Sequence, residues 1–230
     1  MKENPFLNIC WVEPADDYWA QYIKREGHAF SCEKGYQVVC EGDIVDKVYY
    51  LETGLARYTM NDINGRTRTI GLLLPGSIFG EGPVILQAPV TIGVQAMKDC
   101  TFYYTPRNKI ISMIYQDPEL SIEIIRNVTL KFRNLLKCFS LLSFATPEER
   151  LIYFCSSILK TRQHEVFEQW HRLPVDLTQE QLGEIIGANR VTVCRIIAKW
   201  KKESRLKIIN KAIYINTNLL KQTEIARAAP

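Results

Sequence analysis

The amino-acid sequence predicts an α+β protein with a small antiparallel β-barrel or sandwich, a long helix and a winged helix-turn-helix. Three observations lead to this prediction. Glycine-punctuated β-prone runs fill residues 29–105, an apolar heptad pattern runs through residues 125–142, and helix-capping residues flank two amphipathic helices after residue 177. We therefore place the domain boundaries at 1–115, 116–145 and 146–230.

Length and composition indicate an ordinary globular protein. The 230 residues suit two modest domains, and 47% of them are apolar. The first residues lack the apolar run of a signal peptide and no stretch suits a membrane span, so we expect a cytoplasmic protein. The seven cysteines are scattered without a C-x-x-C pair, which indicates free thiols and predicts neither a metal nor a cofactor.

The N-terminal part begins with a helical leader in residues 1–28, whose apolar face is Trp19, Tyr22 and Ile23. Short runs bounded by turn residues then predict strands. The expected strands are residues 37–40, 48–52, 55–60, 68–74, 91–97 and 101–104. Strands of this length and spacing favour a small barrel or sandwich.

After Pro106 the pattern becomes helical and stays so to Phe144. Apolar residues recur there in alternating steps of three and four, as in a coiled coil. This seam consists of Ile125, Val128, Phe132, Leu135, Phe139 and Leu142. We interpret it as a parallel dimer interface, with packing of the helix on its own barrel as the alternative.

A hinge follows the long helix. Thr146 is a suitable N-cap and Pro147 a suitable first residue for a helix over residues 148–161. The polar stretch of residues 161–172 is expected to be an exposed connection, with His164 and His171 as surface residues that bind no metal.

The next stretch predicts a helix-turn-helix. Thr178 and Gln181 form a capping-box pattern, Gly187 suits the turn, and Asn189 suits the N-cap of the second helix. The second helix has an apolar face, and residues 208–215 read as two short strands of a wing. The apolar residues are Val193, Ile196, Ile197 and Trp200.

The second helix is strongly basic on its other face. Residues 188–211 hold eight Lys or Arg against Glu203 alone, a net charge of +7 in a chain of +4. This contrast predicts double-stranded DNA as a partner, with a solvated amphipathic helix as the alternative. The predicted DNA-binding residues are Arg190, Val191, Thr192, Cys194, Arg195, Lys199, Lys201 and Lys202.

Two motifs carry a resemblance to a known family. P-G-S-I-F-G-E at residues 75–81 and N-R-V-T-V-C-R at residues 189–195 resemble the CRP/FNR regulators. The resemblance implies a cyclic-nucleotide-binding-like β-roll that senses a small molecule, a long dimerisation helix, and a homodimer that binds a palindrome and contacts RNA polymerase, acting as an activator. It implies no catalysis.

Members that bind cyclic nucleotides need a Glu, matched by Glu81, and an Arg for the phosphate, which Val90 replaces here. A buried phosphate without that cation would be poorly compensated. The closest resemblance that we see is to CprK-type halorespiration regulators, which respond to ortho-halogenated phenols. In that group a lysine on the long helix, matched by Lys131, faces the effector, whereas Glu81 stands where the group has a second lysine.

The expected effector is therefore a small aromatic acid such as an ortho-halogenated phenol. The residues expected to bind it are Lys131, Glu81, Gly80, Phe79, Tyr103 and Tyr104. Cyclic-nucleotide control and thiol-redox control remain the alternatives, with Cys194 of interest for the second.

Val191 bears on the DNA sequence that is read. Many family members have a Glu there, which accepts a hydrogen bond from cytosine, whereas valine can only contact a thymine methyl. We predict TTAAT-like half-sites in an inverted repeat with centres about 34 Å apart.

Overall fold

The computed structural model describes residues 9–13, 17–65, 67–161 and 164–225. They form two compact units, one of residues 12–132 and the other of residues 9–11 with residues 133–225. Helix α4 (Pro118–Phe144) contributes its first part to one unit and its last part to the other. Within the described ranges, no helix combines the length and apolarity needed to cross a membrane.

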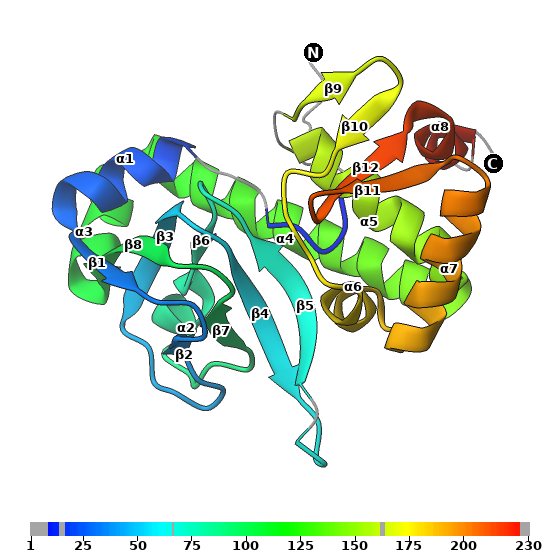
Figure 1. Ribbon diagram of the computed structural model, residues 1–230. Helices are drawn as coiled ribbons and strands as arrows, with labels where there is room; N and C mark the ends of the chain where they lie inside the picture. The colour runs from blue at the N-terminus through cyan, green and yellow to red at the C-terminus, as the bar shows by residue number, and fades with distance from the viewer. Residues whose placement is uncertain (1–8, 14–16, 66, 162–163, 226–230) are drawn as a thin grey trace. The chain divides into compact units, whose positions relative to one another are not determined.

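The first unit contains two four-stranded antiparallel sheets (Figure 1), with strand orders β1-β8-β3-β6 and β2-β7-β4-β5. The strands of the first sheet are β1 (His28–Cys32), β8 (Cys100–Pro106), β3 (Lys47–Thr53) and β6 (Ile78–Phe79). Those of the second are β2 (Gln37–Val39), β7 (Gly93–Ala96), β4 (Ala56–Asn61) and β5 (Thr67–Leu73). All six expected strands are confirmed, and the fold is the expected β-roll; β1 and β6 were not predicted.

Aromatic side chains fill the interior of the roll. The ring of Phe79 stacks on Tyr49 at 4.8 Å between centroids and meets Phe102 edge-on at 5.9 Å. Gly80 follows with φ 93°, and a Cβ there would lie 2.5 Å from the Lys47 carbonyl oxygen, so only glycine fits. The chain then turns directly into the short helix α2 (Glu81–Leu86).

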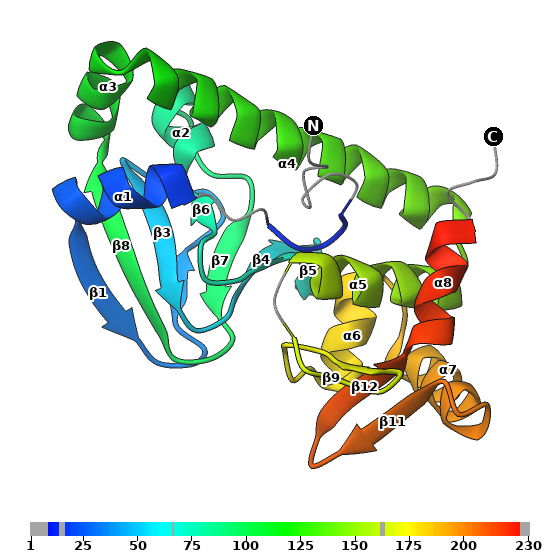
Figure 2. The ribbon, with the colours of Figure 1, turned by 90° about the horizontal axis from the view of Figure 1, so that it is seen from above.

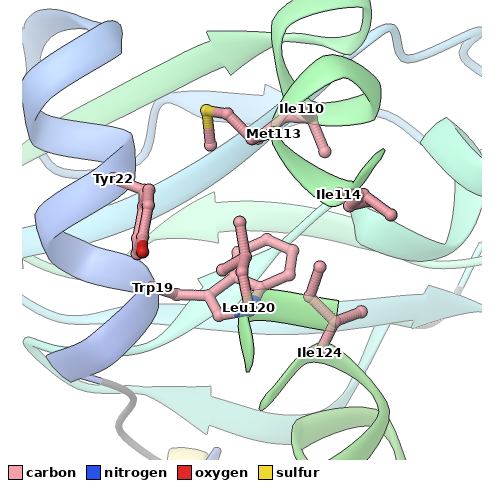
Figure 3. Close-up of a pocket in the computed structure, with 7 residues that line it drawn as sticks. All are labelled: Trp19, Tyr22, Ile110, Met113, Ile114, Leu120 and Ile124. Carbon is pink, nitrogen blue, oxygen red and sulfur yellow. The ribbon is translucent and has the colours of Figure 1, made fainter. Parts of the chain in front are cut away.

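Helices α1 (Asp17–Glu26) and α3 (Arg107–Gln116) pack beside the first turns of α4 (Figure 2). Trp19 and Ile23 are buried and Tyr22 is partly buried, which confirms the apolar face expected for the leader. The crevice among the three helices (Figure 3) leaves no room for a water molecule, so it is packed core and no ligand pocket. Its lining is Trp19, Tyr22, Ile110, Met113, Ile114, Leu120 and Ile124.

The helical stretch expected from Pro106 to Phe144 is not continuous, because it breaks at Asp117. Asp117 is extended (φ −127°, ψ 99°), as expected for a residue that precedes proline. Its Oδ1 accepts the backbone N–H groups of Glu119 and Leu120 at 3.0 and 3.1 Å and so caps α4.

The second unit contains four helices after α4 and one four-stranded sheet (Figure 1). The helices are α5 (Pro147–Thr161), α6 (Gln179–Ile186), α7 (Arg190–Lys202) and α8 (Thr217–Ile225). The sheet has the order β11-β12-β10-β9, with β11 (Leu206–Ile209), β12 (Ala212–Asn216), β10 (Trp170–Arg172) and β9 (Val166–Phe167). The expected helix-turn-helix and wing are therefore confirmed.

Of the exposed connection predicted over residues 161–172, residues 162–163 lie outside the described residues, and the exposure is confirmed for residues 165–169. The segment is not a plain connection, however, because β9 and β10 form a hairpin there and β10 pairs with β12. His164 and His171 are also not plain surface residues. The Nε2 of His164 lies 2.9 Å from the Nδ1 of His171, whose Nε2 lies 3.0 Å from the Thr217 hydroxyl. Burial, together with the nearby His164, lowers the pKa of His171.

Candidate functional site

The capping residues of the helix-turn-helix act as the sequence predicts. The Thr178 hydroxyl accepts the Gln181 backbone N–H at 3.2 Å, and the Gln181 side chain accepts the Thr178 N–H at 2.8 Å. Gly187 is left-handed (φ 66°, ψ 45°), and Asn189 Oδ1 accepts the Thr192 N–H at 2.8 Å. These caps fix where α6 ends and α7 begins.

Helix α7 has one buried face and one exposed face. Trp200 and Val193 are fully buried, while Val191 keeps 57% of its surface exposed. Thr192 and Cys194 are half-buried, and the Cys194 thiol donates to Gln179 Oε1 at 2.6 Å. The exposed basic residues of α7 are Arg190, Arg195, Lys199, Lys201 and Lys202. The outer face of α7 therefore offers cations around one apolar side chain.

Lys199 differs from the other cations of α7 because it is paired within the protein. Its Nζ lies 2.9 Å from Oε2 of Glu148 in the first turn of α5, and Glu148 Oε1 also accepts the indole N–H of Trp200 at 2.8 Å. Burial opposes ionisation of Glu148, but the hydrogen bonds from Lys199 and Trp200 outweigh burial and lower its pKa. Glu148 was not among the predicted residues, because it lies 51 residues from Lys199 in the sequence.

A second contact joins the hinge to the turn of the helix-turn-helix. Arg150 donates to the carbonyl oxygen of Ala145 at 3.0 Å and to that of Gly187 at 3.2 Å. Thr146 and Glu149 form a reciprocal cap at the start of α5, which confirms Thr146 as the N-cap. The hinge and the helix-turn-helix are thus held together by side-chain hydrogen bonds.

The wing turns at Asn210 and Lys211, which both have positive φ (49° and 70°), as a two-residue hairpin requires. Lys207 on β11 lies over the rings of Trp170 and Tyr214, at 4.3 and 5.5 Å from their centroids. The wing adds a further exposed cation, Lys211, at its turn.

The second candidate site is a mostly buried cluster of charges in the roll. Lys131 Nζ donates to Glu81 Oε1 at 2.6 Å and to the Ile78 carbonyl oxygen at 2.6 Å. Glu13 Oε2 lies 3.3 Å from the same ammonium, and the Tyr58 hydroxyl also faces it. The side chains of Lys131, Glu13 and Glu81 keep only 17%, 15% and 11% of their surface exposed.

The electrostatics of this cluster follow from burial and pairing. Burial disfavours the charged ammonium, but Glu81, Tyr58 and Glu13 outweigh burial and raise the pKa of Lys131 well above its ordinary value. Burial, helped by the negative charge of Glu81, raises the pKa of Glu13 despite Lys131. Burial also raises the pKa of Tyr58 well above its ordinary value. This shift favours the charged form of Lys131, and Glu13 at 3.3 Å is a more distant carboxylate partner than Glu81 at 2.6 Å.

The structure brings together only part of the predicted effector site. Lys131 and Glu81 are in contact, and Gly80 sets the turn that starts α2 at Glu81. Phe79 packs among the aromatic rings of the roll. Tyr103 packs with the α1 side of the core, and Tyr104 packs against the rings of Phe30 and Tyr49. Glu13 was not among the residues predicted for this site, because no motif or spacing in the sequence marks it.

The seam on α4 is largely uncovered within the chain. Of its residues, Ile125, Val128, Phe132, Leu135 and Phe139 keep 61%, 43%, 60%, 55% and 68% of their surface exposed, and Leu142 is half-buried. A stripe of apolar side chains this exposed along one helix is typical of an interaction surface.

Comparison with known proteins places both parts of the chain. A family model described as a cyclic nucleotide-binding domain matches residues 29–117, and one described as a Crp-like helix-turn-helix domain matches residues 149–223. The chain is 23% identical over 185 residues to the CRP-like cAMP-activated global transcriptional regulator of Mycobacterium tuberculosis. The aligned region covers 80% of this chain and 81% of that protein.

Two solved structures share the fold over nearly the whole chain. A variant of CooA from Carboxydothermus hydrogenoformans has a TM-score of 0.75 at 20% identity and covers 92% of each chain. A variant of CprK in complex with OCPA has a TM-score of 0.72 at 19% identity and covers 94% of this chain and 98% of that chain.

Proposed function

The chain belongs to the CRP/FNR family of transcription regulators, as a DNA-binding regulator with a ligand-binding domain and no enzymatic role, and we propose that it activates transcription from a palindromic promoter site. The proposed protein is a cytoplasmic homodimer that contacts RNA polymerase. A small molecule bound in the β-roll gates its binding to DNA.

The observation that carries the DNA-reading role is the exposed outer face of α7. Arg190 and Arg195 lie near the N-terminal end of the helix, where a recognition helix meets base edges. Lys201 and Lys202 lie at its last turn, and their exposed charges support our assignment of phosphate contacts to them. Lys199 can join them only by leaving Glu148.

Val191 supports the predicted half-site, because its exposed methyl groups suit contact with a thymine methyl. The test is an anisotropy titration of a labelled TTAAT-ATTAA inverted repeat against the same repeat with a G·C pair at the position that Val191 faces. We expect weaker binding to the substituted repeat; a preference for G·C would contradict the assignment.

The exposed seam on α4 supports the homodimer. A protein that reads an inverted repeat needs a two-fold partner, and a parallel pair of α4 helices would cover the stripe from Ile125 to Leu142. Sedimentation of wild type and of Phe132→Glu tests this interpretation. We expect a dimer and a monomer respectively, whereas a variant that stays dimeric would place the interface elsewhere.

For the effector we propose a small aromatic acid such as an ortho-halogenated phenol, as the resemblance to the CprK-type halorespiration regulators implies. The buried ammonium of Lys131 supports an anionic ligand, because a cation of low exposure pairs well with a phenolate. An ortho-halogen lowers the pKa of a phenol, so charge would select the halogenated compound over phenol itself.

A cyclic nucleotide is the second candidate. The cyclic nucleotide-binding domain match and Glu81 favour it. Val90 disfavours it, because this residue stands where a phosphate-binding Arg is needed and its backbone is already paired with Asp43 and Gly42. Titration of the protein with cyclic AMP and with chlorophenols separates the two candidates.

A further inference from the structure

We propose that Glu13 is the resident counter-anion of Lys131, and that an acidic effector binds by exchanging with the Glu13 carboxylate, which then takes up a proton. This proposal rests on the proposed function, in which the effector is read at Lys131. It adds a residue that no sequence motif marks, and it couples effector binding to pH.

The balance of charge in the cluster supports this exchange. The cluster places one ammonium, that of Lys131, against two carboxylates, those of Glu13 and Glu81. An ammonium has three donors, and the Ile78 carbonyl oxygen and Glu81 Oε1 take two of them at 2.6 Å each. Little donor capacity remains for a third anion. A ligand anion can therefore reach Lys131 only if one carboxylate leaves or is neutralised.

The carboxylates of Glu81 and Glu13 are held differently. Glu81 is the first residue of α2, and the preceding Gly80 has a backbone conformation and a close approach to Lys47 that fix it in place. Glu13 Oε2 lies 3.3 Å from the ammonium, and among the described residues it receives no hydrogen bond of good geometry. The backbone of Glu13 is anchored by its N–H to the Leu72 carbonyl oxygen at 2.8 Å. The side chain of Glu13 can therefore leave Lys131 while its backbone stays paired.

The surroundings of the displaced carboxylate favour its protonation. Glu13 faces Lys131 from α4, Glu81 from α2 and Tyr58 from β4, so its surroundings offer one cation, one anion and one neutral hydroxyl. Burial already raises the pKa of Glu13 with Lys131 beside it. Once a ligand anion takes over the ammonium, that pKa rises further, because the attraction to Lys131 is lost and a second anion is near. One proton is then bound with each ligand anion, and the charge of the cluster does not change.

The test uses 2,4,6-trichlorophenolate, which is ionised throughout pH 7.5–9.5, and the full-length protein as wild type, Glu13→Gln and Glu33→Gln. Glu33 is an exposed carboxylate of the same unit and serves as the matched control. For wild type and the control, we expect the binding constant to fall as pH rises, approaching tenfold per pH unit. For Glu13→Gln we expect no such slope and at least tenfold tighter binding at pH 9.5. Equal slopes in all three proteins would overturn the proposal.

A second measurement needs no ligand. Because the folded-state pKa of Glu13 is raised, wild type loses stability as pH rises from the ordinary value of a glutamate toward the raised value, and Glu13→Gln does not. The Tm of wild type relative to Glu13→Gln should therefore fall as the pH rises above the ordinary pKa of a glutamate. A difference in Tm between the two proteins that does not change with pH would overturn the charge balance described for Lys131, Glu13 and Glu81. If trichlorophenolate binds neither wild type nor Glu13→Gln, the proposed exchange is wrong. Binding of the same samples to the TTAAT repeat would then show that the proposed DNA-reading role is independent of that result.

Discussion

The protein contains two lysine–glutamate pairs of similar chemistry in different surroundings. In the roll, Lys131 and Glu81 meet at 2.6 Å with 17% and 11% of their side chains exposed. In the DNA-binding unit, Lys199 and Glu148 meet at 2.9 Å with 51% and 28% exposed. Water and salt screen the second pair but hardly reach the first. The buried pair should therefore matter most for stability and, in the proposed function, for the charge of the ligand. The half-exposed pair positions α7 and occupies a cation that, in the proposed function, could otherwise bind phosphate.

Among the changes that test this comparison, removal of the buried cation of Lys131 is expected to have the largest effect on stability. Lys131→Met leaves Glu13 and Glu81 buried without their partner, which should lower the free energy of unfolding by about 3–5 kcal/mol at pH 8. The loss should shrink toward pH 5, where unpaired buried carboxylates can be protonated. Urea unfolding at both pH values measures it, with Lys34→Met as a control at an exposed lysine. A loss no larger than that of the control would mean that the pair is not effectively buried.

The next largest effect is expected at Glu148. Glu148→Ala leaves the indole N–H of the fully buried Trp200 without its acceptor, at a cost of about 1–3 kcal/mol in the free energy of unfolding. Glu148→Gln keeps an acceptor for that N–H and should cost clearly less. Unfolding midpoints of the two variants measure the difference. Equal losses would indicate that the negative charge, and not the hydrogen bond to Trp200, holds α7.

Base reading and phosphate contact should separate on the outer face of α7. Arg195→Ala should weaken binding to the TTAAT repeat by about 1–3 kcal/mol and relax preference at one base pair. Lys202→Ala should weaken binding to all sequences alike and reduce the salt slope by about one. Anisotropy titrations on matched and substituted repeats at several salt concentrations distinguish the two. Identical behaviour of both variants would refute the assigned roles.

The smallest expected effect is that of Glu148→Gln on DNA binding, and it tests directly whether the half-exposed pair keeps Lys199 from phosphate. Glu148→Gln releases the ammonium of Lys199, so binding to random-sequence DNA should tighten and its salt slope should steepen by about one. Binding to the TTAAT repeat should gain no sequence preference. If the salt slope is unchanged, Lys199 does not reach phosphate even when it is free of Glu148.

Local signals in the sequence sufficed for elements whose cause is local. The capping box at Thr178, the left-handed Gly187 and the short β-prone runs bounded by turn residues all depend on residues a few positions apart. The break at Asp117 also had a local cause, Pro118, which the long apolar seam obscured. The hairpin of β9 and β10 gave no turn signal, because its left-handed residue is Glu168 and no glycine stands there.

The chemistry of the two lysines could not be predicted in this way, because their partners lie far along the chain. Lys131 meets Glu81 across 50 residues, and Lys199 meets Glu148 across 51. Helical periodicity places Lys199 on an outer face but says nothing about a carboxylate on another helix. For Lys131, the family resemblance pointed to the residue. Its pairing with Glu13 depends on how Val12 and Glu13 lie on β5, which no local pattern encodes.

The most direct test of a regulator gated at Lys131 is the affinity of the wild-type protein for the TTAAT-ATTAA repeat without ligand, with cyclic AMP and with 2,4,6-trichlorophenol. We predict that only trichlorophenol tightens binding, and that the gain disappears on a repeat with G·C at the position that Val191 faces. Equal affinity for both repeats in all three samples would contradict both the proposed gating and the proposed half-site.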